Sequence, residues 1–526
     1  YTLQGIVNLD GTVSVTQDGR TIADRMSVTG GEQFTVPSVI EGASSAFAVA
    51  YTASEGHDEG VEKTASVTVK RETYGEELYA SPDGTDDGDG TRENPMSVDA
   101  AVRKVMPGGT VYMLEGTYSP FTIPYTASGN EEARKSLTAE GSVVITGGSG
   151  KLFVLDSDYW NITGLDVDGK NVAGSRGFMI HGSHNIIERC LIHDTSSDAG
   201  LTITKNRGSR TLWPSYNLIQ NCESYRNRDE SGINADGFAS KSCSGDDNRF
   251  VNCVSHDNAD DGWDLYNTLQ DGPNGRTIIE NCVAYGNGNN GFKLGGEGRE
   301  VAHVLKNSVA FHNKLDGITD NFNPGALNIQ NNTSFDNYRF NMILRPSPYK
   351  TDADGNLTAD GTVKNNASYR TAAFSAGLDK VYDDKISAVI KMNNFLYADG
   401  ENSVSADSFV SLDEADCFSW KDGRIVFGDF LKIAKGSELD QAGAGARLSE
   451  DMEDVTLEEL VANMAADPDS YKADQIFNAV TDYDVETICQ AMKNDKAFAE
   501  NLSILEESYM EKKGIEVVIE ADDAIA

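Results

Sequence analysis

The sequence has 526 residues and a formal net charge of −39 at pH 7. A chain of this length is large enough for several domains, and its strong negative charge argues against nucleic acid or an anionic membrane surface as a partner. No apolar run is long enough to cross a bilayer, so we expect no membrane insertion.

Residues 1–74 alternate apolar and polar side chains between glycine-containing turns, as residues 12–15 and 65–69 illustrate. A period of two is typical of half-buried strands. We therefore predict an accessory domain with an immunoglobulin-like β-sandwich fold at this end of the chain.

A short helix and a first strand are predicted next. Ser97 is placed to cap an amphipathic helix over residues 97–106, which Pro107 and the two glycines after it would end. Residues 110–114 are then predicted as a strand. A helix at this place would cover the open end of a solenoid. We assign that solenoid to residues 75–440, with its coils ending near residue 435.

The middle of the chain repeats one pattern, which is built on an asparagine followed by a small or polar residue. Successive second members lie 31, 29, 26 and 24 residues apart. Each repeat contains short β-rich segments and no amphipathic stretch long enough for a helix. This indicates a mainly β fold, a right-handed parallel β-helix with about three strands per coil. The aligned pairs are Asn221-Cys222, Asn252-Cys253, Asn281-Cys282, Asn307-Ser308 and Asn331-Asn332.

Other positions of the repeat should stack from coil to coil as ladders. Three residues after each pair comes a ring, and we expect aromatic ladders in the core. Two residues further comes an asparagine, expected to bond the backbone at a turn. Four cysteines share another ladder position, and we expect buried thiols there rather than a disulfide framework. These ladders are Tyr225, His256, Tyr285, Phe311 and Phe335; Asn227, Asn258, Asn287, Asn313 and Asn337; and Cys190, Cys222, Cys253 and Cys282.

Four aspartates fall on neighbouring coils of this repeat. Asp236 and Asp261 both precede a glycine and an aromatic residue, and Asp260 and Asp264 flank Asp261. Carboxylates that converge on one point need a cation to stay ionised together, and hard oxygen ligands fit calcium better than zinc or copper. The alternative is that Asp-Gly pairs only form turns, but it does not explain Asp264 at a strand position. The pattern favours a Ca²⁺ site.

Lys293 takes the position of Asp264 on the following coil, where strands of a parallel sheet lie about 4.8 Å apart. A lysine beside a bound Ca²⁺ is favoured as the neutral amine and becomes a usable base. The alternative is a solvated, outward-facing lysine. Lys241 and Arg345 on nearby coils are candidates for contacts with substrate carboxylates, with ordinary surface charge as the alternative.

Residues 441–526 differ in composition from the coils, being rich in Glu, Asp, Ala, Leu and Met at helical spacing. One apolar stripe comprises Leu457, Leu460, Val461 and Met464. We predict an acidic α-helical appendage.

The stretches 234–238, 260–264 and 291–296 resemble polysaccharide lyase family 9, and the resemblance covers roughly residues 77–440. That family comprises pectate and rhamnogalacturonan lyases on a right-handed β-helix. The resemblance implies that Lys293 is the catalytic base and that four aspartates are the calcium ligands: Asp236, Asp260, Asp261 and Asp264.

The resemblance implies a secreted bacterial pectate lyase that uses Ca²⁺ to cleave polygalacturonate by β-elimination, giving 4,5-unsaturated oligogalacturonates. Calcium would also allow an acidic protein to bind an acidic pectic polysaccharide. One alternative is a rhamnogalacturonan lyase of the same family, and another is a non-catalytic carbohydrate-binding β-helix. A polygalacturonase-type hydrolase is disfavoured because its Gly-His-Gly and Arg-Ile-Lys motifs are missing. We expect a monomer outside the cell or at its surface, with a larger polypeptide as an alternative context.

Overall fold

The computed structural model describes residues 1–448 apart from 41–43, 55, 57–58, 71–74, 206–212, 269–273, 349, 375–376 and 383–388, together with 461–462, 464–465, 468, 476, 485–494 and 496–513. The chain divides into two compact units, of which the first comprises Tyr1–Ile425 and Asp429–Leu448 and the second Val426–Gly428 and Ser449–Ala526. No helix in the described part of the chain is long and apolar enough to cross a membrane.

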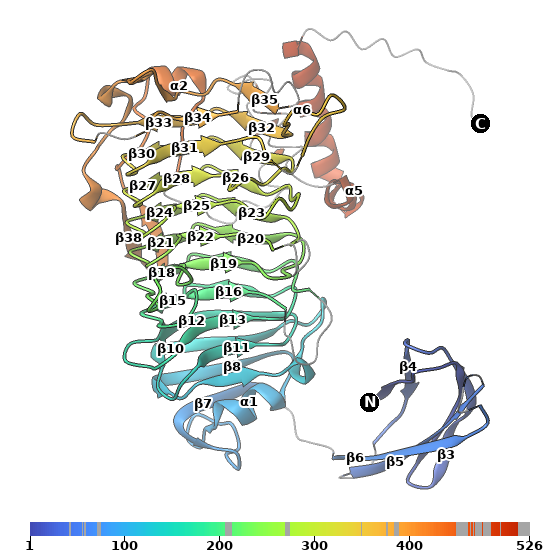
Figure 1. Ribbon diagram of the computed structural model, residues 1–526. Helices are drawn as coiled ribbons and strands as arrows, with labels where there is room; N and C mark the ends of the chain where they lie inside the picture. The colour runs from blue at the N-terminus through green and yellow to red at the C-terminus, as the bar shows by residue number, and fades with distance from the viewer. Residues whose placement is uncertain are drawn as a thin grey trace. The chain divides into compact units, whose positions relative to one another are not determined.

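The first strands form two antiparallel sheets around a small apolar core (Figure 1). Side chains of both sheets, such as Leu3 and Val13, are buried in it. The predicted β-sandwich is confirmed. The predicted boundary between residues 74 and 75 adjoins residues 71–74, which lie outside the described residues. The strands are β1 (Thr2–Ile6), β2 (Gly11–Gln17), β3 (Arg20–Val28), β4 (Gln33–Pro37), β5 (Ser44–Ala53) and β6 (Glu62–Lys70).

A parallel β-helix follows, and in the described residues most of its coils contribute three strands that pair with their counterparts on the next coil. One wall is a ten-stranded parallel sheet. Its strands are β9 (Phe121–Ile123), β11 (Lys151–Leu155), β13 (Arg176–Ile180), β16 (Leu201–Ile203), β19 (Phe238–Ser240), β22 (Trp263–Asp264), β25 (Phe292–Lys293), β28 (Asp316–Thr319), β31 (Phe340–Leu344) and β34 (Lys380–Val381). Figure 1 shows these strands stacked from coil to coil, for example β13, β16 and β19.

The other strands of the coils form the remaining walls. The first coils have one long strand here, and the later coils have two short strands in its place. The long strands are β7 (Gly75–Thr85), β8 (Val105–Tyr118), β10 (Lys135–Ile145) and β12 (Trp160–Asp168). One set of short strands is β14 (Ile186–Glu188), β17 (Leu218–Gln220), β20 (Asn248–Val251), β23 (Thr277–Glu280), β26 (Val304–Lys306), β29 (Leu327–Gln330), β32 (Gly361–Lys364) and β35 (Val389–Met392). The other is β15 (Leu191–His193), β18 (Glu223–Tyr225), β21 (Val254–His256), β24 (Val283–Tyr285), β27 (Val309–Phe311), β30 (Thr333–Phe335) and β33 (Ala367–Tyr369).

Helix α1 (Val98–Lys104) contributes to the apolar core at the first coil, as predicted. The Ser97 hydroxyl accepts a hydrogen bond from the amide of Ala100 and caps the helix. The helix ends at Lys104, and β8 already begins at Val105. The prediction that residues 107–109 separate helix from strand was therefore wrong, because these residues extend the strand.

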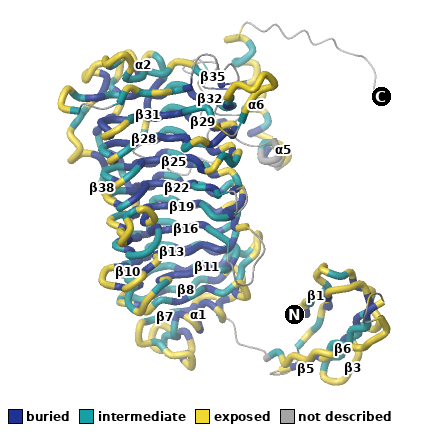
Figure 2. The backbone as a smooth tube through the Cα atoms, in the orientation of Figure 1, coloured by how far each residue is buried: buried dark blue, intermediate teal, exposed yellow. Residues whose placement is uncertain are grey.

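The interior of the coils is built from stacked identical positions (Figure 2). The rings of Phe238, Trp263 and Phe292 stack with centroids 5.0 and 4.9 Å apart. The predicted asparagine ladder is confirmed: Asn258 Oδ1 accepts a hydrogen bond from the backbone N–H of Asn227 over 3.2 Å, and the same bond repeats up to Asn337. The four cysteines of the thiol ladder are buried and unpaired, as expected.

The ladder that starts at Tyr225 is not in the core, contrary to our expectation. Its rings stack on one another, with 5.1 Å between Tyr225 and His256, but they face outward. A segment after the last coil covers them, and Phe430 packs on Phe311 at 4.7 Å. Alternation along the strands explains this, since the neighbouring serine or alanine points inward.

The coils end with β35 at Met392 and not near residue 435, because the chain then leaves the stack and lies along its outer side. Asn252 donates to the carbonyl of Ile425, and Asn331 donates to that of Gly443. The elements of this segment are β36 (Tyr397–Ala398), β37 (Glu401–Asn402), β38 (Phe418–Lys421), β39 (Arg424–Phe427) and α2 (Glu438–Ala442).

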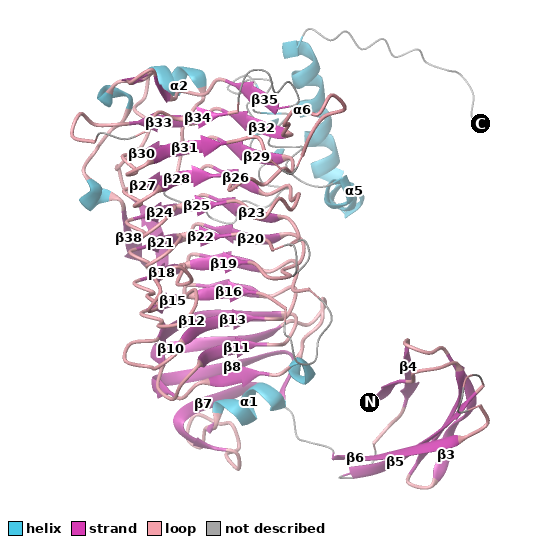
Figure 3. Cartoon of the chain, in the orientation of Figure 1, coloured by secondary structure: helices cyan, strands magenta, loops and turns pink. Residues whose placement is uncertain are grey.

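The C-terminal region is helical where it is described, as predicted (Figure 3). It contains α5 (Val485–Asn494) and α6 (Lys496–Lys513), and Val461 and Met464 are buried in its core. Leu457 and Leu460 of the predicted stripe lie outside the described residues.

Candidate active site

The acidic residues and the lysine of the repeat meet on the outer face of the ten-stranded sheet. Trp263 of β22 pairs with Phe292 of β25, and these two rings point into the core. The next residues point outward, so that Asp264 and Lys293 are direct neighbours, as the repeat predicted. Asp236 and Asp261 also share one position on adjacent coils, because Phe238 pairs with Trp263.

Two lysines bridge the carboxylates of this cluster. Lys293 Nζ lies 2.8 Å from Asp261 Oδ2 and 3.2 Å from Asp264 Oδ1. Lys241 Nζ lies 2.6 Å from Asp236 Oδ2 and 2.7 Å from Asp264 Oδ2. Asp264 therefore has one lysine on each of its oxygens.

One carboxylate oxygen from each of Asp236, Asp261 and Asp264 lies within 4.8 Å of the other two. These side chains are buried, and both lysine side chains are mostly covered. Asp260 lies at the edge of the cluster, where Asn289 Nδ2 donates to it over 2.8 Å. When every group is ionised, the four carboxylates outnumber the two ammonium groups. One divalent cation balances the net negative charge that results.

Burial and mutual repulsion govern the ionisation of these groups. Burial, together with the charges of Asp264 and Asp260, raises the pKa of Asp261 to about 6. Burial would also raise the pKa of Asp264, but the two lysines beside it hold that pKa at about 2. For Lys293 burial acts to lower the pKa, and the carboxylates outweigh it and raise the pKa above the usual value. The cluster thus requires positive charge in its centre.

Asn290 is a part of the site that the sequence reasoning missed. Its backbone N–H donates to Asp261 Oδ1 over 2.9 Å and its Nδ2 donates to the same oxygen over 2.8 Å. This leaves Asp261 Oδ2 for Lys293. The signal was present in the repeat, since Asn289-Asn290 precedes Gly291 as Asp260-Asp261 precedes Gly262.

The two residues named as candidate substrate contacts differ in placement. Lys241 lies inside the carboxylate cluster. Arg345 follows β31 and lies apart from it, where Nη2 contacts Thr319 Oγ1 at 3.2 Å and forms an ion pair with Asp320 at 3.4 Å. Thr319 pairs with Lys293, so Arg345 contacts the strand next to that of the proposed base.

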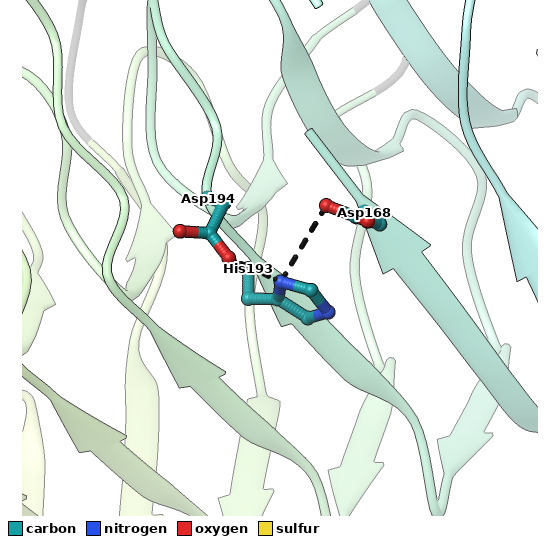
Figure 4. Close-up of side chains that lie close together, drawn as sticks. All are labelled: Asp168, His193 and Asp194. Atoms are coloured by element: carbon teal, nitrogen blue, oxygen red, sulfur yellow. Dashed lines mark hydrogen bonds and ion pairs between the residues drawn. The ribbon is translucent and has the colours of Figure 1, made fainter. Parts of the chain in front are cut away.

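A second group of titratable side chains lies on β12 and β15. Figure 4 shows His193 beside Asp168 and Asp194. His193 Nδ1 lies 2.7 Å from Asp194 and 3.6 Å from Asp168, and Nε2 lies 2.9 Å from Asp166. Burial lowers the pKa of His193, but these carboxylates outweigh burial and raise it. Arg226 also forms an ion pair with Asp194. Both ring nitrogens have carboxylate partners, so the group is explained as an ion-pair cluster.

Two family models match this chain. Residues 78–371 match the family described as "Pel9A-like, right handed beta helix region". Residues 1–72 match the family described as "Pectate disaccharide-lyase central Ig-like domain". The first match covers more than half of the chain and agrees with the predicted handedness of the coils.

Individual proteins show the same similarity. The chain is 38% identical to pectate disaccharide-lyase of Dickeya chrysanthemi over 397 residues, which are 75% of this chain and 50% of that protein. It is 36% identical to pectate lyase L of Paenibacillus polymyxa in an alignment 412 residues long, which covers 73% of this chain and 88% of that protein. The crystal structure of pectate lyase Pel9A matches with a TM-score of 0.57 and 28% identity, covering 70% of this chain and 91% of that one. This chain thus spans half the length of the Dickeya relative.

Proposed function

Because the chain is a member of polysaccharide lyase family 9, we propose that it is a calcium-dependent pectate lyase that cleaves polygalacturonate by β-elimination. One observation carries the proposal: Lys293 Nζ lies within 3.2 Å of two buried aspartates that belong to a cluster of carboxylates. A strong base candidate and a cation site are thereby joined in one place.

The donor set fits a calcium ion. Asp236, Asp261 and Asp264 would hold it through carboxylate oxygens, and Asp260 lies beside them. The ionised cluster also has the negative charge that a divalent cation would balance. When bound, such an ion supplies positive charge next to the uronate carboxylate, which acidifies the C5 proton.

Lys293 is the proposed base. A divalent cation bound among the carboxylates would offset the negative charge that raises the pKa of Lys293 and so favour its neutral amine. The neutral amine takes the C5 proton, and the electron pair of the C5–H bond forms the C4–C5 double bond. The C4–O bond breaks, and its electron pair leaves with the oxygen of the departing sugar, which takes a proton from water. Lys241 and Arg345 are proposed to contact carboxylates of the polymer.

The proposed substrate is a long polyanion, which does not pass through a membrane by itself. We therefore propose that the enzyme acts outside the cell or at its surface. The monomeric state stays a prediction.

Polygalacturonate, incubated with the full chain and CaCl₂, tests the proposal. We expect a product that absorbs in the ultraviolet because its double bond is conjugated to the carboxylate. EGTA should abolish its formation, and excess CaCl₂ should restore it. Reducing ends without absorbance would instead indicate a hydrolase, and binding without either signal a non-catalytic protein. A parallel incubation with rhamnogalacturonan tests the alternative substrate.

A further inference from the structure

A row of residues runs along the active-site wall, two positions beyond Asp264 and Lys293. Ala239 pairs with Asp264, and Asp264 pairs with Lys293, so the residues two positions further on are neighbours in the same order. Arg345 belongs to the same row, because Ile343 pairs with Thr319 and Thr319 with Lys293. From coil to coil the row reads Lys241, Tyr266, Gly295, Asn321 and Arg345.

Tyr266 is the aromatic residue of this row beside the catalytic cluster. Lys293 Nζ lies 5.1 Å from the centroid of its ring, a distance at which an ammonium group and an aromatic face attract each other. The backbone N–H of Tyr266 donates to Asp264 Oδ1 over 3.0 Å. Its hydroxyl donates to Glu297 Oε1 over 3.1 Å. The ring is therefore held at both ends, yet it stays partly exposed.

A glycine on the next coil leaves the space that this ring occupies. A Cβ atom added to Gly296 would lie 2.4 Å from Cδ2 and 2.5 Å from Cε2 of Tyr266. The ring thus lies directly over the Gly295-Gly296 backbone. Gly296 is not among the residues with positive φ, so its lack of a side chain matters for space and not for backbone conformation.

On these contacts, and resting on the proposed function, we propose that Tyr266 is a substrate-contacting residue. Its ring packs against the uronate next to the one that loses its C5 proton. An aromatic ring offers a large apolar surface at small entropic cost, and the C–H faces of a pyranose ring fit such a surface. Its contact with Lys293 also positions the amine relative to the bound sugar.

Steady-state kinetics of the full chain on polygalacturonate with saturating CaCl₂ test this role. Tyr266→Ala should raise KM roughly tenfold, as the loss of about 1.4 kcal/mol of binding free energy would do. Tyr266→Phe keeps the ring and loses only the hydroxyl, so it should retain a KM close to that of the unchanged protein. An unchanged KM in Tyr266→Ala would overturn the proposal, as would equal KM increases in both variants.

Gly296→Ala gives an independent test, because the new methyl group should displace the ring without removing it. We expect a KM increase like that of Tyr266→Ala, and little further increase when both substitutions are combined. Independent, additive effects of the two substitutions on KM would contradict the placement of the Tyr266 ring against Gly296.

Binding of polygalacturonate to Lys293→Ala, with and without Tyr266→Ala, separates this proposal from the proposed function. If the unchanged chain binds the polymer but forms no unsaturated product, the lyase activity is refuted, and the role of Tyr266 in binding is still measured in the Lys293→Ala pair. Equal affinities of the two variants refute the role of Tyr266 while the lyase activity stands.

Discussion

Asp264 shows how the site is organised at the scale of single residues. Lys241 binds one of its oxygens and Lys293 the other, so a single carboxylate fixes both ammonium groups. Each oxygen of Asp261 also has its own partner, Asn290 on Oδ1 and Lys293 on Oδ2. Such partners orient a ligand group before any ion or substrate arrives.

Asn290→Ala should therefore weaken the proposed calcium site without removing a proposed ligand. Residues that orient metal ligands typically contribute about 10- to 100-fold in metal affinity. We expect the CaCl₂ concentration for half-maximal activity to rise by at least about tenfold, with near-normal turnover at saturating CaCl₂. Asn356→Ala is the matched control, because Asn356 bonds the carboxylate of Asp352 in an exposed turn. Equal calcium dependence of both variants would exclude this role for Asn290.

At the scale of elements, the ladders explain why strands of only two or three residues are stable. At the position before the short strands, Asn217 donates to Asn248, and the amide of Thr277 donates to His303 Nδ1 over 3.0 Å. His303 thus accepts a backbone bond like the one that Asn248 accepts from Asn217. It is fully buried, and burial lowers its pKa to about 3.

This histidine makes the stability of the coils depend on pH. Its pKa is lower in the folded protein than in the unfolded chain, so the unfolded chain binds the proton more readily. Above pH 6.5, neutral His303 makes its full contribution to the free energy of unfolding. As the pH drops toward 3, this contribution falls by about 1.4 kcal/mol per pH unit. His303→Asn should reduce the fall in Tm between pH 7 and pH 5. A variant with the same pH dependence as the unchanged protein would refute this account.

At the scale of the whole molecule, the last segment of the first unit holds several coils together. Asn331 Nδ2 donates to the Gly443 carbonyl over 2.7 Å, and Ala446 N–H donates to Thr333 Oγ1 over 2.8 Å. Asn307 Nδ2 also donates to the Arg447 carbonyl. We therefore propose Leu448 as the end of the solenoid domain, rather than residue 440.

Two truncated chains test this boundary. A chain of residues 1–448 keeps these bonds, whereas a chain of residues 1–440 loses them and is cut within α2. Each buried hydrogen bond contributes about 1 kcal/mol, so the shorter chain should unfold at a lower temperature by several degrees. Equal Tm values would place the boundary at residue 440 after all.

The parallel β-helix and the carboxylate–lysine cluster could be predicted because both follow from a residue pattern that recurs on each coil. The pairing of Asp264 with Lys293 follows from the repeat alone. The segment after Met392 has no repeat, so its path over the outward-facing rings could not be read from the sequence. Asn290 could have been found, because Asn289-Asn290 repeats the position of Asp260-Asp261. Tyr266 could not, because its role depends on which atoms face each other across coils.

Turnover and calcium binding of Lys293→Ala test the central claim most directly. The absorbance assay with polygalacturonate should show a fall of at least about 100-fold, as expected for the loss of a general base. Calorimetric titration with CaCl₂ should still show binding, since the carboxylates are unchanged and one competing positive charge is gone. A variant that forms unsaturated product at the rate of the unchanged protein would contradict the assignment of Lys293 as the base.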